Sequence, residues 1–170
     1  FQGDPEVMNI VIGQTCGGIE LFQPAIELTK TGDELSKIGD DVTYTITLDN
    51  NSSTDTPDLE CTITDAMLGI DKSVTLASGA SDVTNASYTV LTEDDSGLLG
   101  AQLTNTASVS CSPIAFPNQL TDSQSVSVTL IHPSFTVSKQ CTNEPVPQEG
   151  PANYDVFISN TGDVELIITA

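Results

Sequence analysis

Three polar residues, Lys30, Asp65 and Asn105, lie in stretches of alternating apolar residues and in phase with the apolar members. Side chains on a β-strand alternate between its two faces, so each should point toward the core with its apolar neighbours. Those neighbours are Ile26 and Leu28 for the lysine, Cys61 and Ile63 for the aspartate, and Ala107, Val109 and Cys111 for the asparagine. The pattern predicts a buried amine, carboxyl group and carboxamide.

These three groups can form an amide bond between side chains. Burial disfavours charge, so a buried lysine shifts toward its neutral amine, which is a nucleophile. A buried, protonated Asp65 can polarise the Asn105 carboxamide and shuttle protons. We therefore expect an autocatalytic, intramolecular isopeptide bond between Lys30 and Asn105, formed with loss of ammonia.

The same residues also fit ordinary structural roles. Lys30 can extend its ammonium group past a strand end into water, Asp65 can form a turn or an ion pair, and Asn105 can cap a loop. The intact mass distinguishes these roles from the cross-link, because only the cross-link removes one ammonia.

The four cysteines favour an oxidising, extracytoplasmic location. Cys61 and Cys111 share the inward parity of two strands, which favours a disulfide between them. Cys16 and Cys141 fit either a bond between successive subunits or partners outside this sequence. A zinc site is not expected, because the chain has no CxxC pair and His132 is its one histidine.

Acidic turns are the candidate metal ligands. Calcium binds convergent oxygens that often come from turns. The weak candidates are Asp40, Asp41, Asp94 and Asp95. We favour the interpretation that these are solvated turns, because the sequence has no EF-hand and no glycine-rich calcium repeat. No cofactor other than calcium is expected.

Three Asn-x-Ser sequons offer candidate glycosylation sites on loops of an exported protein. They begin at Asn50, Asn51 and Asn85.

Composition excludes several classes of function. The chain has 24 Asp and Glu against 4 Lys and Arg, a formal charge of −20, which repels nucleic acid and anionic lipid. No segment is apolar enough to insert into a membrane. A Ser–His–Asp set and a glycine-rich phosphate loop are both absent, so we expect no enzyme acting on an external substrate.

The chain should fold, with a thin aliphatic core, because 38% of it is hydrophobic.

Short alternating stretches separated by turns predict an all-β fold, an immunoglobulin-like β-sandwich with antiparallel Greek-key sheets. The expected strands are Ala25–Thr31, Asp41–Leu48, Leu59–Asp65, Ser73–Leu76, Ala86–Leu91, Ala101–Ser112 and Ser123–Leu130. The stretch Asn50–Pro57 is expected to be a polar loop.

The chain contains an internal repeat. Residues 19–30 align without a gap with residues 128–139, and Tyr44 and Asn50 correspond to Tyr154 and Asn160. This alignment divides the chain into an N-terminal arm or end of a preceding repeat (1–23), a complete repeat (24–132) and the first strands of a second, incomplete repeat (133–170).

The order of motifs resembles the Ig-like conserved repeat domain of bacterial and archaeal surface proteins, domain of unknown function eleven. The motifs are Leu28-Thr29-Lys30-Thr31, Ile38-Gly39-Asp40-Asp41-Val42-Thr43-Tyr44, Asn50, Ile63-Thr64-Asp65 and Leu103-Thr104-Asn105-Thr106-Ala107. The segment after Asp65 departs from the family pattern, because it lacks a proline. The resemblance implies tandem modules in exported stalks, sheaths or fibres. The polar trio is similar to that of self-crosslinking domains in adhesins and pili.

We therefore expect a structural module of a cell-surface fibre, whose partners are adjacent repeats or other subunits of the same polymer. Open strand edges would let residues 1–23 of one subunit complete the sheet begun at residues 133–170 of another. The alternative is an adhesin-type module that binds a surface or glycan through loops at one end of the sandwich, where Phe116 and Pro117 are the candidate contacts.

Overall fold

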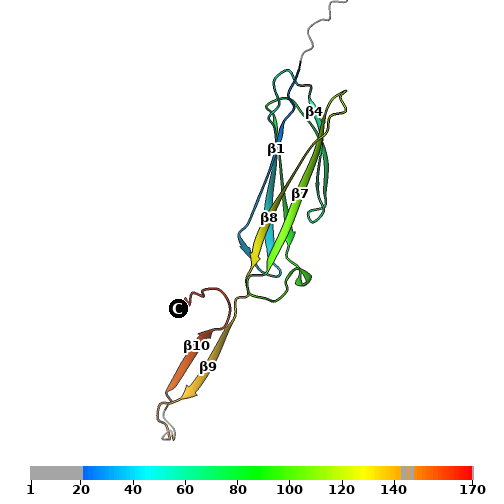
Figure 1. Ribbon diagram of the computed structural model, residues 1–170. Helices are drawn as coiled ribbons and strands as arrows, with labels where there is room; N and C mark the ends of the chain where they lie inside the picture. The colour runs from blue at the N-terminus through cyan, green and yellow to red at the C-terminus, as the bar shows by residue number, and fades with distance from the viewer. Residues whose placement is uncertain (1–20, 143–144, 146–147, 170) are drawn as a thin grey trace, which may run out of the picture.

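Two facing sheets make up most of the computed structural model, which describes residues 21–142, 145 and 148–169 (Figure 1). One sheet has the order β1-β3-β6 and the other the order β2-β8-β7-β4-β5. Their strands are β1 Ile26–Gly32, β2 Leu35–Ser36, β3 Asp41–Asn50, β4 Leu59–Asp65, β5 Ile70–Leu76, β6 Ser81–Thr89, β7 Gln102–Pro113 and β8 Leu120–Leu130. A short 3-10 helix, η1, spans Thr92–Asp94.

The strand order is that of an immunoglobulin-type sandwich. The sheet β1-β3-β6 corresponds to strands A-B-E, and β5-β4-β7-β8 corresponds to C′-C-F-G. The first strand switches sheets, because β1 pairs with β3 while β2 pairs in parallel with β8; the other pairings are antiparallel. The expected all-β, immunoglobulin-like sandwich is confirmed.

Alternation along the strands builds the core. On β3 the inward side chains are at most 1% exposed, and on β4 at most 3%. They are Val42, Tyr44, Ile46 and Leu48, then Leu59, Cys61, Ile63 and Asp65. The parity expected from the sequence is therefore confirmed. Strands β5 and β6 begin earlier than expected, because their first halves are polar and partly exposed and give a weak apolar signal.

A separate hairpin follows the sandwich (Figure 1), formed by β9 (Phe135–Cys141) and β10 (Tyr154–Asn160). Its pairs run from Phe135↔Asn160 to Cys141↔Tyr154. The β1–β3 pairs run from Ile26↔Asn50 to Gly32↔Tyr44, so every pair has its counterpart at the repeat spacing. This common register supports the predicted duplication.

Among the described residues, none forms a helix with the length and apolar character needed to cross a bilayer.

Candidate functional site

The core contains an ion pair between the two sheets. Lys30 of β1 donates a hydrogen bond from Nζ to Oδ2 of Asp65 at the end of β4, and both side chains are fully excluded from solvent. The lysine therefore does not extend into water. Removing one partner of such a pair leaves an uncompensated buried charge, which costs about 3–5 kcal/mol.

The Asp65 carboxyl group is held by the turn that follows β4. Its Oδ1 accepts a hydrogen bond from the backbone N–H of Leu68 at 3.0 Å, which leaves Oδ2 for Lys30. Gly69 completes the turn into β5 with a φ of 64°. Asp65 thus forms both the turn and the ion pair that were considered as structural roles.

Tyr44 of β3 forms one wall of the site. The Lys30 ammonium lies 4.9 Å from the centroid of the Tyr44 ring, within cation–π range. Gly32 allows the ring to pack closely, since a Cβ there would lie 2.8 Å from Tyr44 Cδ1. Burial raises the pKa of Tyr44, and the negative charge of nearby Asp65 raises it further.

Asn105 of β7 lies in the same core and is 2% exposed. Its Nδ2 is buried without a hydrogen-bond partner, as is the hydroxyl oxygen of Tyr44. An unsatisfied buried donor costs about 1–3 kcal/mol, so this carboxamide is an exception to normal core packing. The structure thus brings Lys30 and Asp65 into contact. It also buries Asn105, whose side-chain amide nitrogen has no hydrogen-bond acceptor.

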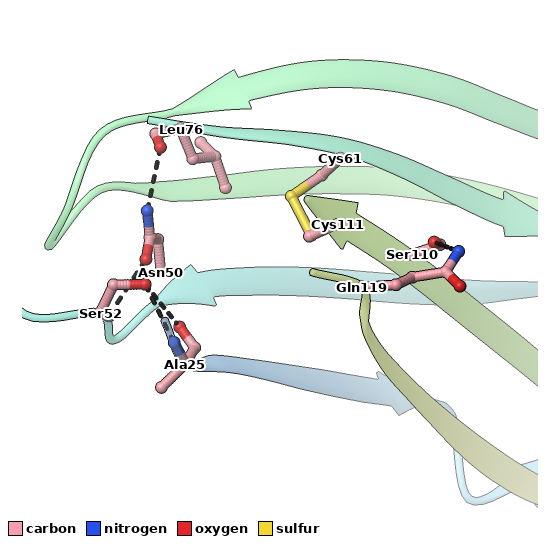
Figure 2. Close-up of a disulfide and its surroundings, with 8 residues drawn as sticks. All are labelled: Ala25, Asn50, Ser52, Cys61, Leu76, Ser110, Cys111 and Gln119. Atoms are coloured by element: carbon pink, nitrogen blue, oxygen red, sulfur yellow. Dashed lines mark hydrogen bonds between the residues drawn. A yellow bond between two sulfur atoms is a disulfide. The ribbon is translucent and has the colours of Figure 1, made fainter. Parts of the chain in front are cut away.

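A disulfide joins Cys61 of β4 to Cys111 of β7, as predicted (Figure 2). The two residues are directly opposite each other in the β4–β7 register. The bond therefore links neighbouring strands of one sheet, whereas the conserved disulfide of antibody domains links strands B and F across the two sheets. Such a bond is typical of proteins in an extracellular or otherwise oxidising environment.

Asn50 is not a glycan acceptor in the folded chain, which corrects the sequence prediction. It is 1% exposed because β3 continues through it, with inward parity. Its Nδ2 donates to the carbonyl of Leu76 at 2.9 Å, and its Oδ1 accepts from the backbone N–H of Ser52 at 3.1 Å (Figure 2). Asn51 and Asn85 are exposed and remain candidates.

The acidic candidates for calcium are engaged by other groups of the protein. Asp40 pairs with Lys37, and Asp41 accepts a hydrogen bond from Thr89. Asp94 accepts hydrogen bonds from the Tyr88 hydroxyl and from a backbone N–H. In the described part of the chain, no three His, Cys, Asp or Glu side chains converge as a metal site.

The joint between the sandwich and the hairpin contains a cluster of charged side chains that the sequence did not predict. His132 lies between Asp95, with its Nε2 2.7 Å from Oδ2, and Asp163, with its Nδ1 2.9 Å from Oδ2. Hydrogen bonds to Asp163 and Asp95 raise the pKa of His132. No sequence pattern signalled this cluster, because its members are 31 and 37 residues apart.

The bond predicted between Cys16 and Cys141 of successive subunits stays a prediction. Cys141 ends β9. Cys16 and the rest of the expected arm up to residue 20 lie outside the described residues.

No family model matches this chain, and no curated protein matches it. Among solved structures, it is similar to the CARDB domain of a Pyrococcus furiosus protein, crystallised in complex with di-metal ions. That match has 10% sequence identity and a TM-score of 0.42, and it covers 65% of this chain and 96% of the other.

Proposed function

We propose that this chain is a structural repeat module of an exported cell-surface fibre, stalk or sheath, with a mechanical rather than a catalytic role. The observation that carries the proposal is the common register of the β1–β3 and β9–β10 hairpins. Two hairpins with the same pairing, one after the other, are typical of a tandem array of β-sandwich units. The motif order shared with the Ig-like conserved repeat family supports the same reading.

The short joint between the units supports a defined linear arrangement. Only four residues separate β8 from β9. Backbone N–H groups of Thr161 and Gly162 both donate to the carbonyl of Ser134 at 2.9 Å, and His132 adds its two carboxylate contacts. Through His132, which contacts Asp95 of the sandwich and Asp163 after β10, the joint is tied to both units, which favours a defined arrangement of successive units.

The second hairpin presents an apolar face that requires a covering sheet. Residues equivalent to the inward-facing side chains of β1 and β3 are about half exposed, from 49% to 61%. They are Phe135, Val137, Tyr154, Val156 and Ile158. In the proposed fibre, this face is covered by further strands of the same polypeptide or by a strand donated head-to-tail by a neighbouring subunit.

Electron microscopy of the native material tests the proposal. We expect filaments or sheath material with a regular axial repeat along which sandwich units follow one another. Dispersed monomers that bind a ligand saturably would contradict the fibre and favour adhesion.

An adhesin is the second candidate, and one loop favours it. Between β7 and β8, Ile114 and Phe116 are 41% and 43% exposed, and Ala115 between them has a φ of 67°, unusual for a residue other than glycine. The Phe116 ring packs edge-to-face against Phe22 at 4.8 Å. In this reading, Phe116→Ala abolishes binding of whole cells or purified chain to a glycan or mineral surface while the thermal unfolding midpoint stays unchanged.

A further inference from the structure

We propose that the chain joins Lys30 Nζ to Asn105 Cγ in an isopeptide bond, by a reaction it carries out on itself with Asp65 as the acid–base group. The inference depends on the geometry of the core and holds whether or not the chain assembles into a fibre.

Contacts between β1 and β8 show which residues of the five-stranded sheet lie opposite Lys30. Leu28 donates its backbone N–H to Asp122 of β8 at 2.9 Å. A Cβ on Gly32 would lie 3.3 Å from the side chain of Val126, also on β8. Lys30 lies midway between Leu28 and Gly32, so it is level with the middle of the Asp122–Val126 segment.

The other two groups lie at the same level. The residue midway along that segment, Gln124, pairs with Ala107 of β7. The β4–β7 register runs to Thr64↔Ser108, and its next step puts Asp65 opposite Ala107. Asn105 is the next inward residue of β7, a diagonal neighbour of Asp65 on the same face. The amine, the carboxyl group and the carboxamide therefore converge between the two sheets.

The surroundings hold each group for the reaction. The Leu68 N–H fixes one oxygen of Asp65, and the other meets Lys30 Nζ. The Tyr44 ring restricts the lysine from the side. The Asn105 amino group has no hydrogen bond to break on leaving, and its departure removes an unsatisfied donor from the core.

The reaction balances without an oxidant, reductant or external reagent. A proton first moves from Nζ to Oδ2 of Asp65, which converts the ion pair into a neutral amine and a neutral acid. The Nζ lone pair then attacks Cγ of Asn105 while the Asp65 carboxyl group donates a hydrogen bond to the amide oxygen. Asp65 relays one proton from Nζ to Nδ2, the Cγ–Nδ2 bond breaks, and ammonia leaves. Asp65 retains the first proton and stays neutral beside the new amide.

The product would tie the two sheets together. Lys30 belongs to the β1-β3-β6 sheet and Asn105 to the five-stranded sheet, whereas the disulfide joins two strands of the five-stranded sheet alone. The isopeptide thus supplies the cross-sheet covalent link that this sandwich otherwise lacks among its described residues.

Intact mass of the purified, denatured full chain is the first test. We expect the oxidised chain to weigh one ammonia less than its sequence and its disulfide require. Asn105→Ala keeps the Lys30–Asp65 pair and should show its full sequence mass. Lys139→Arg changes the repeat-equivalent, exposed lysine and should still lose ammonia.

Tryptic mapping after reduction of the disulfide locates the bond. The Lys and Arg residues of this chain are Lys30, Lys37, Lys72 and Lys139. A cross-linked Lys30 resists trypsin, so we expect a branched product that joins residues 1–37 to residues 73–139. Asn105→Ala should restore cleavage after Lys30.

Two results would overturn the proposal. One is a folded wild-type chain with its full mass and a cleavable Lys30. The other is an ammonia loss that maps to a cyclised asparagine with Lys30 free. Both are read on the wild-type chain, so the test stands even if a variant fails to fold.

Discussion

The two hairpins of this molecule share a sequence pattern and a register but differ in burial. Lys30 is packed over Tyr44 in the sandwich, and Lys139 lies 3.8 Å from the centroid of the equivalent Tyr154 in the hairpin. The first pair is buried, whereas Lys139 and Tyr154 are exposed. Local sequence is therefore sufficient to set strand pairing and the lysine–tyrosine contact. The chemistry of the lysine depends on the opposite sheet, which supplies Asp65 and Asn105.

The turns that follow the two hairpins extend the comparison. Oδ1 of Asn50 accepts the N–H of Ser52 at 3.1 Å, and Oδ1 of Asn160 accepts the N–H of Gly162 at 3.0 Å. The backbone N–H of Asn51 donates to Ala25, as that of Thr161 donates to Ser134. The two hairpins thus share single hydrogen bonds in the turns that follow them, as well as their strand register.

The largest difference between the two lysines should appear on removing the acid. Asp65→Ala removes both the partner of the Lys30 amine and the acid that the proposed cross-link needs, so we expect a loss of at least about 3–5 kcal/mol in the free energy of unfolding. Lys139→Ala, at the exposed equivalent, should change it by less than about 0.5 kcal/mol. Denaturant unfolding followed by circular dichroism measures both. Equal effects would show that the two lysines have similar environments.

Reducing the disulfide should weaken the sandwich and leave the hairpin unaffected. Cys61 and Cys111 are 50 residues apart in sequence, so their bond restricts the unfolded chain, and its loss should cost about 2–4 kcal/mol. Hydrogen exchange resolves the two regions: protection should fall in β4 and β7 and stay unchanged in β9 and β10. A uniform loss of protection would mean that sandwich and hairpin unfold as one unit.

The position opposite each tyrosine sharpens the comparison further. Gly32 is opposite Tyr44, whereas Cys141 is opposite Tyr154. In the sandwich the Tyr44 ring packs directly against Gly32. Gly32→Ala should therefore lower the free energy of unfolding by about 1–3 kcal/mol, because the added methyl group would crowd the ring. Thr31→Ala, on the exposed face of β1, is the matched control. Thermal unfolding of the two variants measures the difference, and equal midpoints would contradict the crowding.

Strand alternation explains how much could be predicted from the sequence. Period-two parity was sufficient to place Lys30, Asp65 and Asn105 in the core and to pair Cys61 with Cys111. The same alternation continues from Leu48 to Asn50 and places the Asn50 side chain in the core. The polar residues after Asn50 led instead to the prediction of a loop that begins at this residue. The His132 cluster escaped prediction because it arises where chain segments distant in sequence meet.

The smallest effect concerns the joint, and it depends on pH. The pKa of His132 is raised above its ordinary value of 6.5 by hydrogen bonds to Asp163 and Asp95. Protonated His132 therefore stabilises the joint fully below about pH 6.5, and this contribution is lost as pH rises through the raised pKa. The pKa values of Asp95 and Asp163 are lowered from 3.8, so their contribution is lost only in stronger acid.

Equivalent hydrogen bonds in the two units provide an internal control for this effect. Gln23 is the counterpart of His132, and its backbone N–H donates to the uncharged Ser53. After correction for intrinsic rates, exchange of the Thr161 N–H should speed up from pH 6 to pH 8, while that of the Asn51 N–H stays constant. His132→Gln recreates the first joint and should remove the pH dependence. If Thr161 remains equally protected at both pH values in the parent chain, the charge on His132 does not hold the joint, and the backbone bonds alone do.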